Sequence, residues 1–343
     1  VIDPANPYVL GPQLLCAATE LPIEEAEIAL WSAHDVAAAL IDDGLLRRRA
    51  GRYFPSPGVD PHPAVDIRGS AGGQVAILET DTGRLLGGVG AGRAPATVHP
   101  GAVYLHQGET YVVDSLDLES AIAFVHAEDP GYSTHAREVT DIEITGTGEH
   151  TDLGSVTLGV VPVAVTNTVT GYLRRTLSGE VLDFVELDLP PQHLPTVAVM
   201  YTITPEALAH NGIDPVRIPG SLHAAEHAAI GLLPLVASCD RGDIGGLSTA
   251  LGPGGLPTVF VYDGHPGGAG FADRGYQQAA VWLGATLDAI SACECPNGCP
   301  SCVQSPKCGN GNDPLDKMGA IAVLQTVLTA LEANRPLDGR LPG

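Results

Sequence analysis

The sequence predicts a multidomain α+β protein with an N-terminal winged helix, a β-rich, barrel-like middle and a mixed α/β C-terminal domain built around clustered cysteines. Short helical patterns followed by a hairpin open the chain, and alternating strand patterns with glycine turns fill its middle. Five of the seven cysteines fall within residues 293–308. At 343 residues the chain is long enough for several cores. The expected domain boundaries are 1–57, 58–190 and 191–343.

The first 57 residues carry three short helical patterns and then a strand pair. The helices are expected near residues 11–19, 23–31 and 33–43, and the strands within 45–54, turning at Ala50 and Gly51. This is the element order of a winged helix, in which the hairpin forms the wing. The hairpin carries the densest positive cluster of the chain, namely Arg47, Arg48, Arg49 and Arg52.

The arginine hairpin has two interpretations. Guanidinium groups bind phosphate oxygens, and the adjacent Tyr53 or Phe54 could stack on a base, which would make the wing a nucleic-acid contact. Alternatively, the arginines pair with some of the forty acidic residues at a face between domains. Arg174 and Arg175, after Tyr172, form a second, smaller basic site with the same two interpretations.

The middle of the chain reads as a series of short strands. Residues 74–79 and 84–89 flank the hairpin signal Thr-Asp-Thr-Gly, and one helix is expected near residues 118–126. Further strands are expected at 102–106, 110–113, 155–166 and 182–187. We interpret this region as a barrel-like scaffold that holds the wing and the C-terminal domain apart.

The stretch CECPNGCPSCVQSPKC runs from Cys293 to Cys308. Its glycine and prolines bend the loop, so that four soft thiolates can surround one tetrahedral zinc ion. A disulfide network fits poorly because five is an odd number. Four thiolates close the coordination shell, which predicts one structural zinc ion that clamps two helices. The expected ligands are Cys295, Cys299, Cys302 and Cys308, with Cys293 as a possible substitute.

The rest of the C-terminal domain is predicted from strand and helix patterns. Strands are expected at 196–204 and 257–262, and helices at 222–236 and 271–292. The last helix is expected to begin at Asp313-Pro314, a good N-cap followed by proline at the first position. Without metal, we expect this helix to lose its docking.

A second motif, H-x-x-E-H, is formed by His223, Glu226 and His227. On a helix these side chains share one face, as inverted zinc peptidases require, so a zinc hydrolase is an alternative function. The competing interpretation is a hydrogen-bonded polar cluster without catalysis. Further acidic or imidazole groups that could join the motif are Asp240, Asp243, Asp263 and His265.

The stretch GHPGGAG, at residues 264–270, lies between a predicted strand and a predicted helix. This placement resembles a phosphate cradle at a helix N-terminus. The dinucleotide fingerprint fails because Asp273 stands where a third glycine is required. Close packing of the glycines against a sheet is the alternative.

Composition limits the function. The net charge of −23 repels phosphates, so any DNA contact requires a local basic patch. Neither lysine, Lys307 or Lys317, stands in a Walker A motif, so this chain alone is not expected to be a P-loop ATPase. The absence of a long apolar run or signal segment predicts a cytoplasmic protein, and the start at Val1 suggests a fragment. A protein-interaction module without a DNA role is a third hypothesis.

The stretch CECPNGCPSCVQSPKCGNGNDPLDK resembles the end of the MrfA-type zinc-binding domain found in bacterial superfamily II DNA helicases of the MrfA/SftH type. Three other stretches are similar to the same family: HAAEHAAIGLLPLVASCDRGDIGG (223–246), VYDGHPGGAGFADRG (261–275) and GAVYLHQGETYVVDSLDLE (101–119). The resemblance therefore covers most of the chain.

The resemblance implies the C-terminal accessory region of a DNA-dependent ATPase. Such a region would guide or grip single-stranded or tailed DNA while two upstream RecA-like domains, covalently linked to it, hydrolyse ATP with magnesium. The family also implies 3′-to-5′ translocation and a role in DNA repair. We expect a monomer with no membrane partner.

Overall fold

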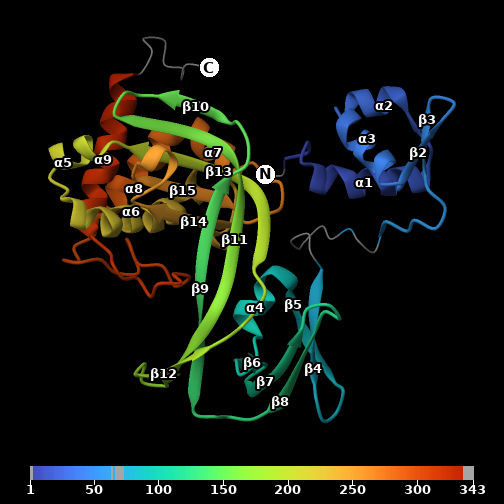
Figure 1. Ribbon diagram of the computed structural model, residues 1–343, viewed down its shortest axis with the longest axis horizontal. Helices are drawn as coiled ribbons and strands as arrows, with labels where there is room; N and C mark the ends of the chain where they lie inside the picture. The colour runs from blue at the N-terminus through green and yellow to red at the C-terminus, as the bar shows by residue number, and fades with distance from the viewer. Residues whose placement is uncertain (1–2, 63–64, 66–72, 335–343) are drawn as a thin grey trace.

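The computed structural model describes residues 3–62, 65 and 73–334. The N-terminal unit has the winged-helix order, with a small sheet in the order β1-β3-β2 (Figure 1). Ala50 and Gly51 turn the wing hairpin, and both have positive φ angles, 50° and 76°, as a two-residue hairpin turn requires. Its elements are α1 (Pro7–Glu20), β1 (Ile23–Glu24), α2 (Glu25–Leu30), α3 (His34–Asp42), β2 (Leu46–Arg49) and β3 (Arg52–Pro55).

A five-stranded sheet follows, in the order β5-β4-β8-β7-β6. The expected helix near residues 118–126 is wrong, because β8 runs through Ile122–Ala127 between β4 and β7. Its pairing with β4 is parallel and its pairing with β7 is antiparallel. The elements are β4 (Gln74–Glu79), β5 (Leu85–Gly90), α4 (Ala94–Thr97), β6 (Val103–His106), β7 (Glu109–Asp117) and β8 (Ile122–Ala127).

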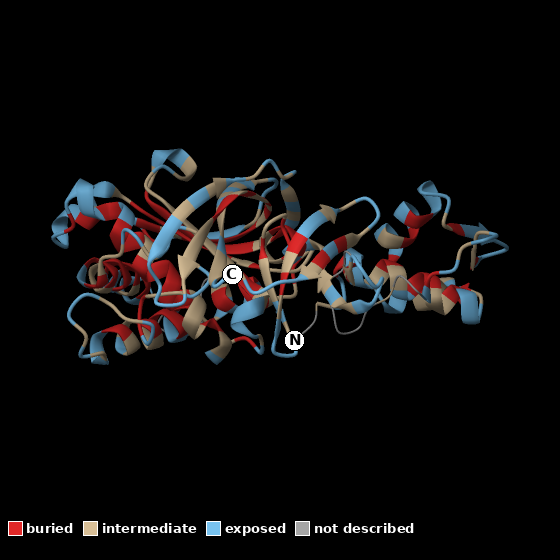
Figure 2. Ribbon diagram, turned by 90° about the horizontal axis from the view of Figure 1, so that it is seen from below, coloured by how far each residue is buried: buried red, intermediate tan, exposed pale blue. Residues whose placement is uncertain are grey.

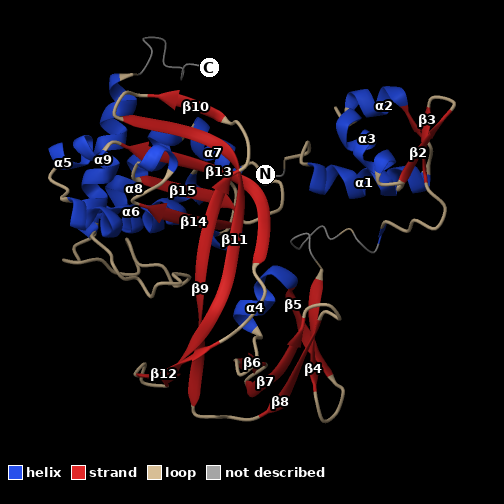
Figure 3. Ribbon diagram, in the orientation of Figure 1, coloured by secondary structure: helices blue, strands red, loops and turns tan. Residues whose placement is uncertain are grey.

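The longest strand, β11, organises the remaining sheet of seven strands (Figure 3). It pairs with β9 over most of its length, with β10 and β12 near its two ends, and with β13. Because β13 pairs with β11 on one side and with β15 on the other, this sheet contains strands from both sides of residue 190. The domain boundary expected at residue 190 stays a prediction. The strands are β9 (Tyr132–Ile144), β10 (Glu149–Asp152), β11 (Val156–Thr176), β12 (Val181–Glu186), β13 (Gln192–Ile203), β14 (Ile244–Thr249) and β15 (Thr258–Asp263).

Helices cover the β13–β15 part of this sheet (Figure 1), and the largest core is buried there (Figure 2). Trp282 is completely buried there, and its indole N–H donates a 2.8 Å hydrogen bond to the Ala229 carbonyl. The helix expected over 271–292 divides at Gln278. No helix in the described part of the chain could cross a membrane. The helices are α5 (Pro205–His210), α6 (Ile218–Leu232), α7 (Phe271–Gln277), α8 (Ala279–Ala292) and α9 (Lys317–Ala333).

The start of α9 also differs from its prediction. Asp313-Pro314 is a cis peptide in the preceding loop, and the helix begins at Lys317 with Asp316 as its N-cap. The Asp316 carboxylate accepts the Gly319 N–H at 2.8 Å and pairs with Arg217 at 2.7 Å. The true cap therefore ties the start of α9 to the segment that leads into α6.

Candidate metal centre

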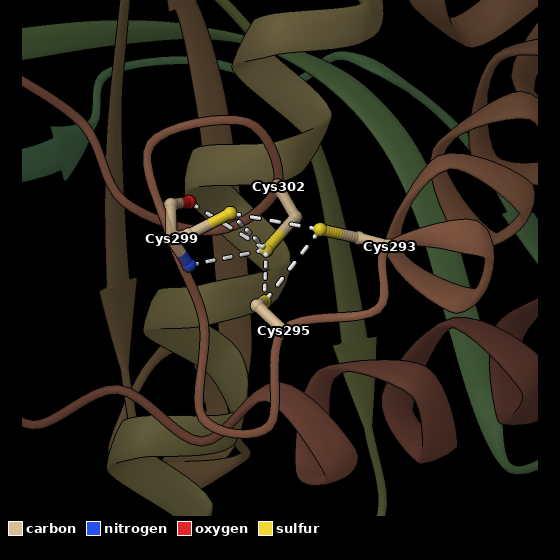
Figure 4. Close-up of side chains that lie close together, drawn as sticks. All are labelled: Cys293, Cys295, Cys299 and Cys302. Carbon is tan, nitrogen blue, oxygen red and sulfur yellow. Dashed lines mark hydrogen bonds between the residues drawn. The ribbon is translucent and has the colours of Figure 1, made fainter.

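Four cysteines meet where α8 ends. Figure 4 shows the sulfur atoms of Cys293, Cys295, Cys299 and Cys302 turned toward one another. The sulfur–sulfur distances along this group are 3.6, 3.5, 3.5 and 3.8 Å. A zinc ion at 2.3 Å from four tetrahedral thiolates separates the sulfurs by about 3.8 Å. The donor type, number and spacing therefore fit one zinc ion without rearrangement of the chain.

The loop geometry explains why these thiols converge. The Cys299 carbonyl accepts the N–H groups of Cys302, Val303 and Gln304, so the chain folds back sharply after the third cysteine. Gly298 permits this fold at φ 107°, since a Cβ there would lie 2.5 Å from Val303. The Ser301 N–H and the neighbouring thiols lower the pKa of Cys299 to about 7, which favours its thiolate, whereas burial raises the pKa of Cys302 to about 12.

The grouping differs from the ligand set favoured by spacing. Cys293 stands in the group of four, whereas Cys308 lies with His223 and His227. Cys293 is the C-cap of α8 and has an extended backbone, which directs the chain from the helix into the loop. We therefore propose Cys293, Cys295, Cys299 and Cys302 as the zinc ligands.

Lys317 contacts the candidate metal centre, and it was not among the residues expected there from the sequence. It is almost fully buried at the start of α9, and its ammonium donates to the carbonyls of Cys293 at 2.5 Å and Cys295 at 2.7 Å. The same nitrogen lies 3.6 Å from the Cys295 sulfur. Four thiolates around Zn²⁺ leave a net negative charge, which this buried cation offsets. The signal that could have indicated Lys317 is its place at the end of the cysteine-rich stretch that resembles the MrfA-type zinc-binding domain.

Replacing Lys317 by methionine is expected to weaken zinc binding about tenfold, because outer-shell partners of a metal site contribute 10–100-fold in affinity. Competition with a chromophoric chelator measures this change. Lys307→Met is the matched control, since Lys307 is the other lysine of the chain and donates to the Arg241 carbonyl rather than to the cysteines. Equal zinc retention by both variants would remove Lys317 from the metal centre.

The H-x-x-E-H motif lies on α6, with His227 and Glu226 buried. Burial disfavours the Cys308 thiolate, but hydrogen bonds from His223 and His227 outweigh this effect and lower the pKa of Cys308 to about 5. Burial also raises the pKa of Glu226, although a hydrogen bond from Ser248 opposes the rise. The two histidines of the motif therefore form a His-His-Cys group with Cys308, and this group is separate from the group of four cysteines.

The arginines of the wing are all exposed, but they are not equivalent. Arg48 pairs with Glu25 at 2.7 Å, and Arg52 pairs with Glu24 at 2.8 Å. Arg47 and Arg49 make no ion pair with any other described residue. Half of the cluster therefore has acidic partners, but these lie within the N-terminal unit, and a face between domains stays a prediction.

The position of Tyr53 disfavours the base-stacking role, which stays a prediction. Only 5% of Tyr53 is exposed, because its ring packs in the core of the N-terminal unit. Its hydroxyl donates to the Glu25 carboxylate at 3.1 Å, and the Arg48 guanidinium lies over its ring. Tyr53 therefore anchors α2 to the wing, and the half-buried Phe54 is the aromatic residue left nearer to the surface.

The second predicted basic site is half-buried. Arg174 donates through Nε to Asp183 at 2.7 Å and lies over the ring of Tyr132. The Nε of Arg175 is buried and has no hydrogen-bond partner among the described residues. Their nucleic-acid role stays a prediction.

The GHPGGAG loop holds a carboxylate where a phosphate cradle would hold an anion. Asp263 accepts the N–H groups of Ala269 at 2.6 Å, Phe271 at 3.1 Å and Ala272 at 2.8 Å. Burial raises the pKa of Asp263, although these three bonds oppose the rise. The helix N-terminus is thus already neutralised from within the protein, which favours the close-packing interpretation.

The same loop contacts the N-terminal unit. Asn6 is the N-cap of α1, and its amide donates to the carbonyls of Pro266 at 2.8 Å and Gly268 at 2.5 Å. Gly267 must be glycine here, because its φ is 73° and a Cβ would lie 2.3 Å from Asn6. This buried contact fixes the start of the winged helix against the C-terminal domain.

Comparison with known proteins identifies both parts. The ATP-dependent helicase HRQ1 winged helix domain matches residues 2–70, and the MrfA Zn-binding domain matches residues 225–303. The ATP-dependent helicase YprA of Bacillus subtilis is 28% identical over 88% of this chain and 41% of its own length. The ATP-dependent helicase hrq1 of Schizosaccharomyces pombe is 26% identical over 95% of this chain and 32% of its own length.

A solved structure agrees. The crystal structure of the DUF1998 helicase MrfA bound to DNA matches 95% of this chain and 43% of that one, at 25% identity and a TM-score of 0.59. A winged helix joined to a four-cysteine domain defines this protein as a zinc-binding, helicase-associated region. The chain belongs to the family of MrfA- and Hrq1-type helicases, and it spans less than half the length of these relatives.

Proposed function

We propose that this chain is the C-terminal accessory module of a DNA-dependent ATPase and that it engages single-stranded DNA for a motor linked to it. The observation that supports this proposal most is the structural likeness of nearly the whole chain to a helicase solved with DNA. The proposal assigns ATP hydrolysis, magnesium and 3′-to-5′ movement to the linked RecA-like domains, and it includes a role in DNA repair. The zinc ion is structural, because four thiolates leave no position for a substrate.

The wing supplies the phosphate contact in this proposal. Arg49 lies directly opposite Arg52 in the hairpin register, and Arg47 lies opposite Phe54. Like charges that face each other across a strand pair are unfavourable unless counter-charges lie nearby. Arg52 has Glu24, whereas Arg47 and Arg49 have no acidic partner among the described residues. In a chain with a net charge of −23, these exposed guanidiniums are the positions that we assign to the DNA backbone.

The double substitution Arg47→Ala with Arg49→Ala is expected to weaken single-stranded DNA binding and to flatten its salt dependence. Loss of two phosphate contacts reduces the slope of log K against log salt concentration by about 1.4. Fluorescence anisotropy over a salt series measures both quantities. Arg48→Ala with Arg52→Ala removes the same charge from the ion-paired positions and is expected to change the slope less.

Each outcome separates the competing functions. An unchanged slope in the Arg47/Arg49 variant would exclude the wing from DNA contact. Wild-type protein that binds DNA with no salt dependence, or not at all, would favour the protein-interaction module. A zinc hydrolase based on Glu226 receives no support from the structure, because that carboxylate packs against β14.

A further inference from the structure

A second group of metal-binding side chains lies apart from the four-cysteine site. His223 and His227 come from one face of α6, and Cys308 comes from the loop before α9. Their ligand atoms all lie within 4.8 Å of one another, and the Cys308 sulfur is 3.4 Å from Nε2 of His223. The two imidazole rings have centroids 4.3 Å apart. Two segments about eighty residues apart in sequence thus converge on one point.

The hydrogen bonds of the imidazoles define which nitrogen faces the sulfur. Nδ1 of His223 lies 2.8 Å from the Pro314 carbonyl, and Nδ1 of His227 lies 2.9 Å from the Val303 carbonyl. A carbonyl oxygen only accepts, so each Nδ1 carries a proton, and Nε2 is the nitrogen available to a metal, which would displace any proton that Nε2 donates to the Cys308 sulfur. Metal-bound histidines are oriented in the same way, with the second nitrogen donating to a carbonyl or carboxylate.

The third donor is fixed by its own loop. The Asn312 N–H donates to the Cys308 sulfur at 3.2 Å. The Asn312 side chain closes the loop by accepting the Ser305 N–H at 2.7 Å and donating to the Ser305 carbonyl at 3.0 Å. Asn312 has a φ of 65°, a left-handed conformation that asparagine tolerates better than most residues. The loop therefore holds the thiol in place facing α6.

We propose that His223, His227 and Cys308 bind a second zinc ion, with a water molecule in the fourth position. In tetrahedral zinc geometry a sulfur and a nitrogen ligand are separated by about 3.5 Å, close to the 3.4 Å found between Cys308 and His223. Glu226 is not a ligand, because it faces the sheet and a Cβ on Gly246 would lie 2.8 Å from its Oε1. The site is thus not the H-x-x-E-H arrangement of a zinc peptidase.

The two zinc sites are adjacent but separable. The Val303 carbonyl that orients His227 belongs to the residue directly after Cys302. Zinc bound in the four-cysteine site would fix the position of this carbonyl and so orient His227 for the second zinc ion. A metal-free thiol–imidazole cluster is the opposing interpretation, and the zinc content decides between them.

The test counts zinc per chain by elemental analysis after the 343-residue protein has been saturated with zinc and passed over a weak chelating resin. We expect two zinc ions in the wild type and in Cys239→Ser, a cysteine outside both groups. We expect one in Cys308→Ala and one in His223→Ala. One zinc in the wild type, or two in Cys308→Ala, would overturn the proposal.

X-ray absorption at the zinc edge of the wild type gives a readout that does not depend on how the variants fold. Two filled sites contain nitrogen donors from two histidines among the sulfur donors of five cysteines. A spectrum that requires sulfur donors alone would overturn the proposal. Nitrogen donors at zinc would support it even if Cys308→Ala did not fold.

Discussion

Replacing Cys299 by serine is expected to release the structural zinc ion and to free α9 from the C-terminal domain. Cys299 supplies both a thiolate and the carbonyl that folds the loop back. The carbonyls of Cys293 and Cys295 hold Lys317, the first residue of α9. Losing the metal would therefore leave a buried ammonium without its ordered partners, which is costly in a protein interior.

The expected loss in the free energy of unfolding is about 5 kcal/mol or more, since zinc binding to structural sites is itself folding free energy. Hydrogen exchange should show the largest loss of protection in α9, with α3 of the winged helix unchanged as an internal reference. Cys239→Ser is the matched control, because that thiol lies outside both cysteine groups. Protection of α9 that survives complete zinc loss would show that its apolar packing alone holds the helix.

The cysteine cluster was recognisable from spacing, but the membership of the four was not. When only loop length is considered, any four of the five thiols within these sixteen residues could surround a tetrahedral zinc ion. The structure separates them because Cys308 is drawn toward the histidines of α6, which are distant in sequence. Spacing alone contains no information about such a contact.

The fold was predicted best where the determining interactions are local. The wing hairpin and the β4–β5 hairpin are set by their own turns and alternating side chains, and both were expected. Residues 118–126 failed because their apolar content permits a helix, whereas pairing with β4, far back in the chain, makes Ile122–Ala127 a strand. The same limit applies to Tyr53, whose burial depends on packing against α1 and α3 rather than on its neighbours.

Replacing Asp263 by alanine is the second change from which we expect a large effect. The carboxylate is completely buried and accepts three N–H groups around the first turn of α7. Its removal leaves these donors unsatisfied inside the protein, at a cost of about 1–3 kcal/mol for each group without a new partner. Some donors would recruit water, so we expect a total loss of about 3–5 kcal/mol in the free energy of unfolding.

The effect should extend to the winged helix, because the same carboxylate shapes the loop that Asn6 contacts. Gly267 and Gly268 adopt positive φ angles of 73° and 84°, which bring their backbone against Asn6. The hydrogen bond from the Ala269 N–H to Asp263 stabilises this backbone conformation.

Chemical denaturation measures the stability loss, and hydrogen exchange at α1 measures the loosened contact. Asp273→Ala, an exposed carboxylate in the same helix, is the control that should leave both unchanged within about 0.5 kcal/mol. A similar loss for both variants would mean that negative charge at the start of α7, rather than the buried hydrogen bonds, stabilises the loop.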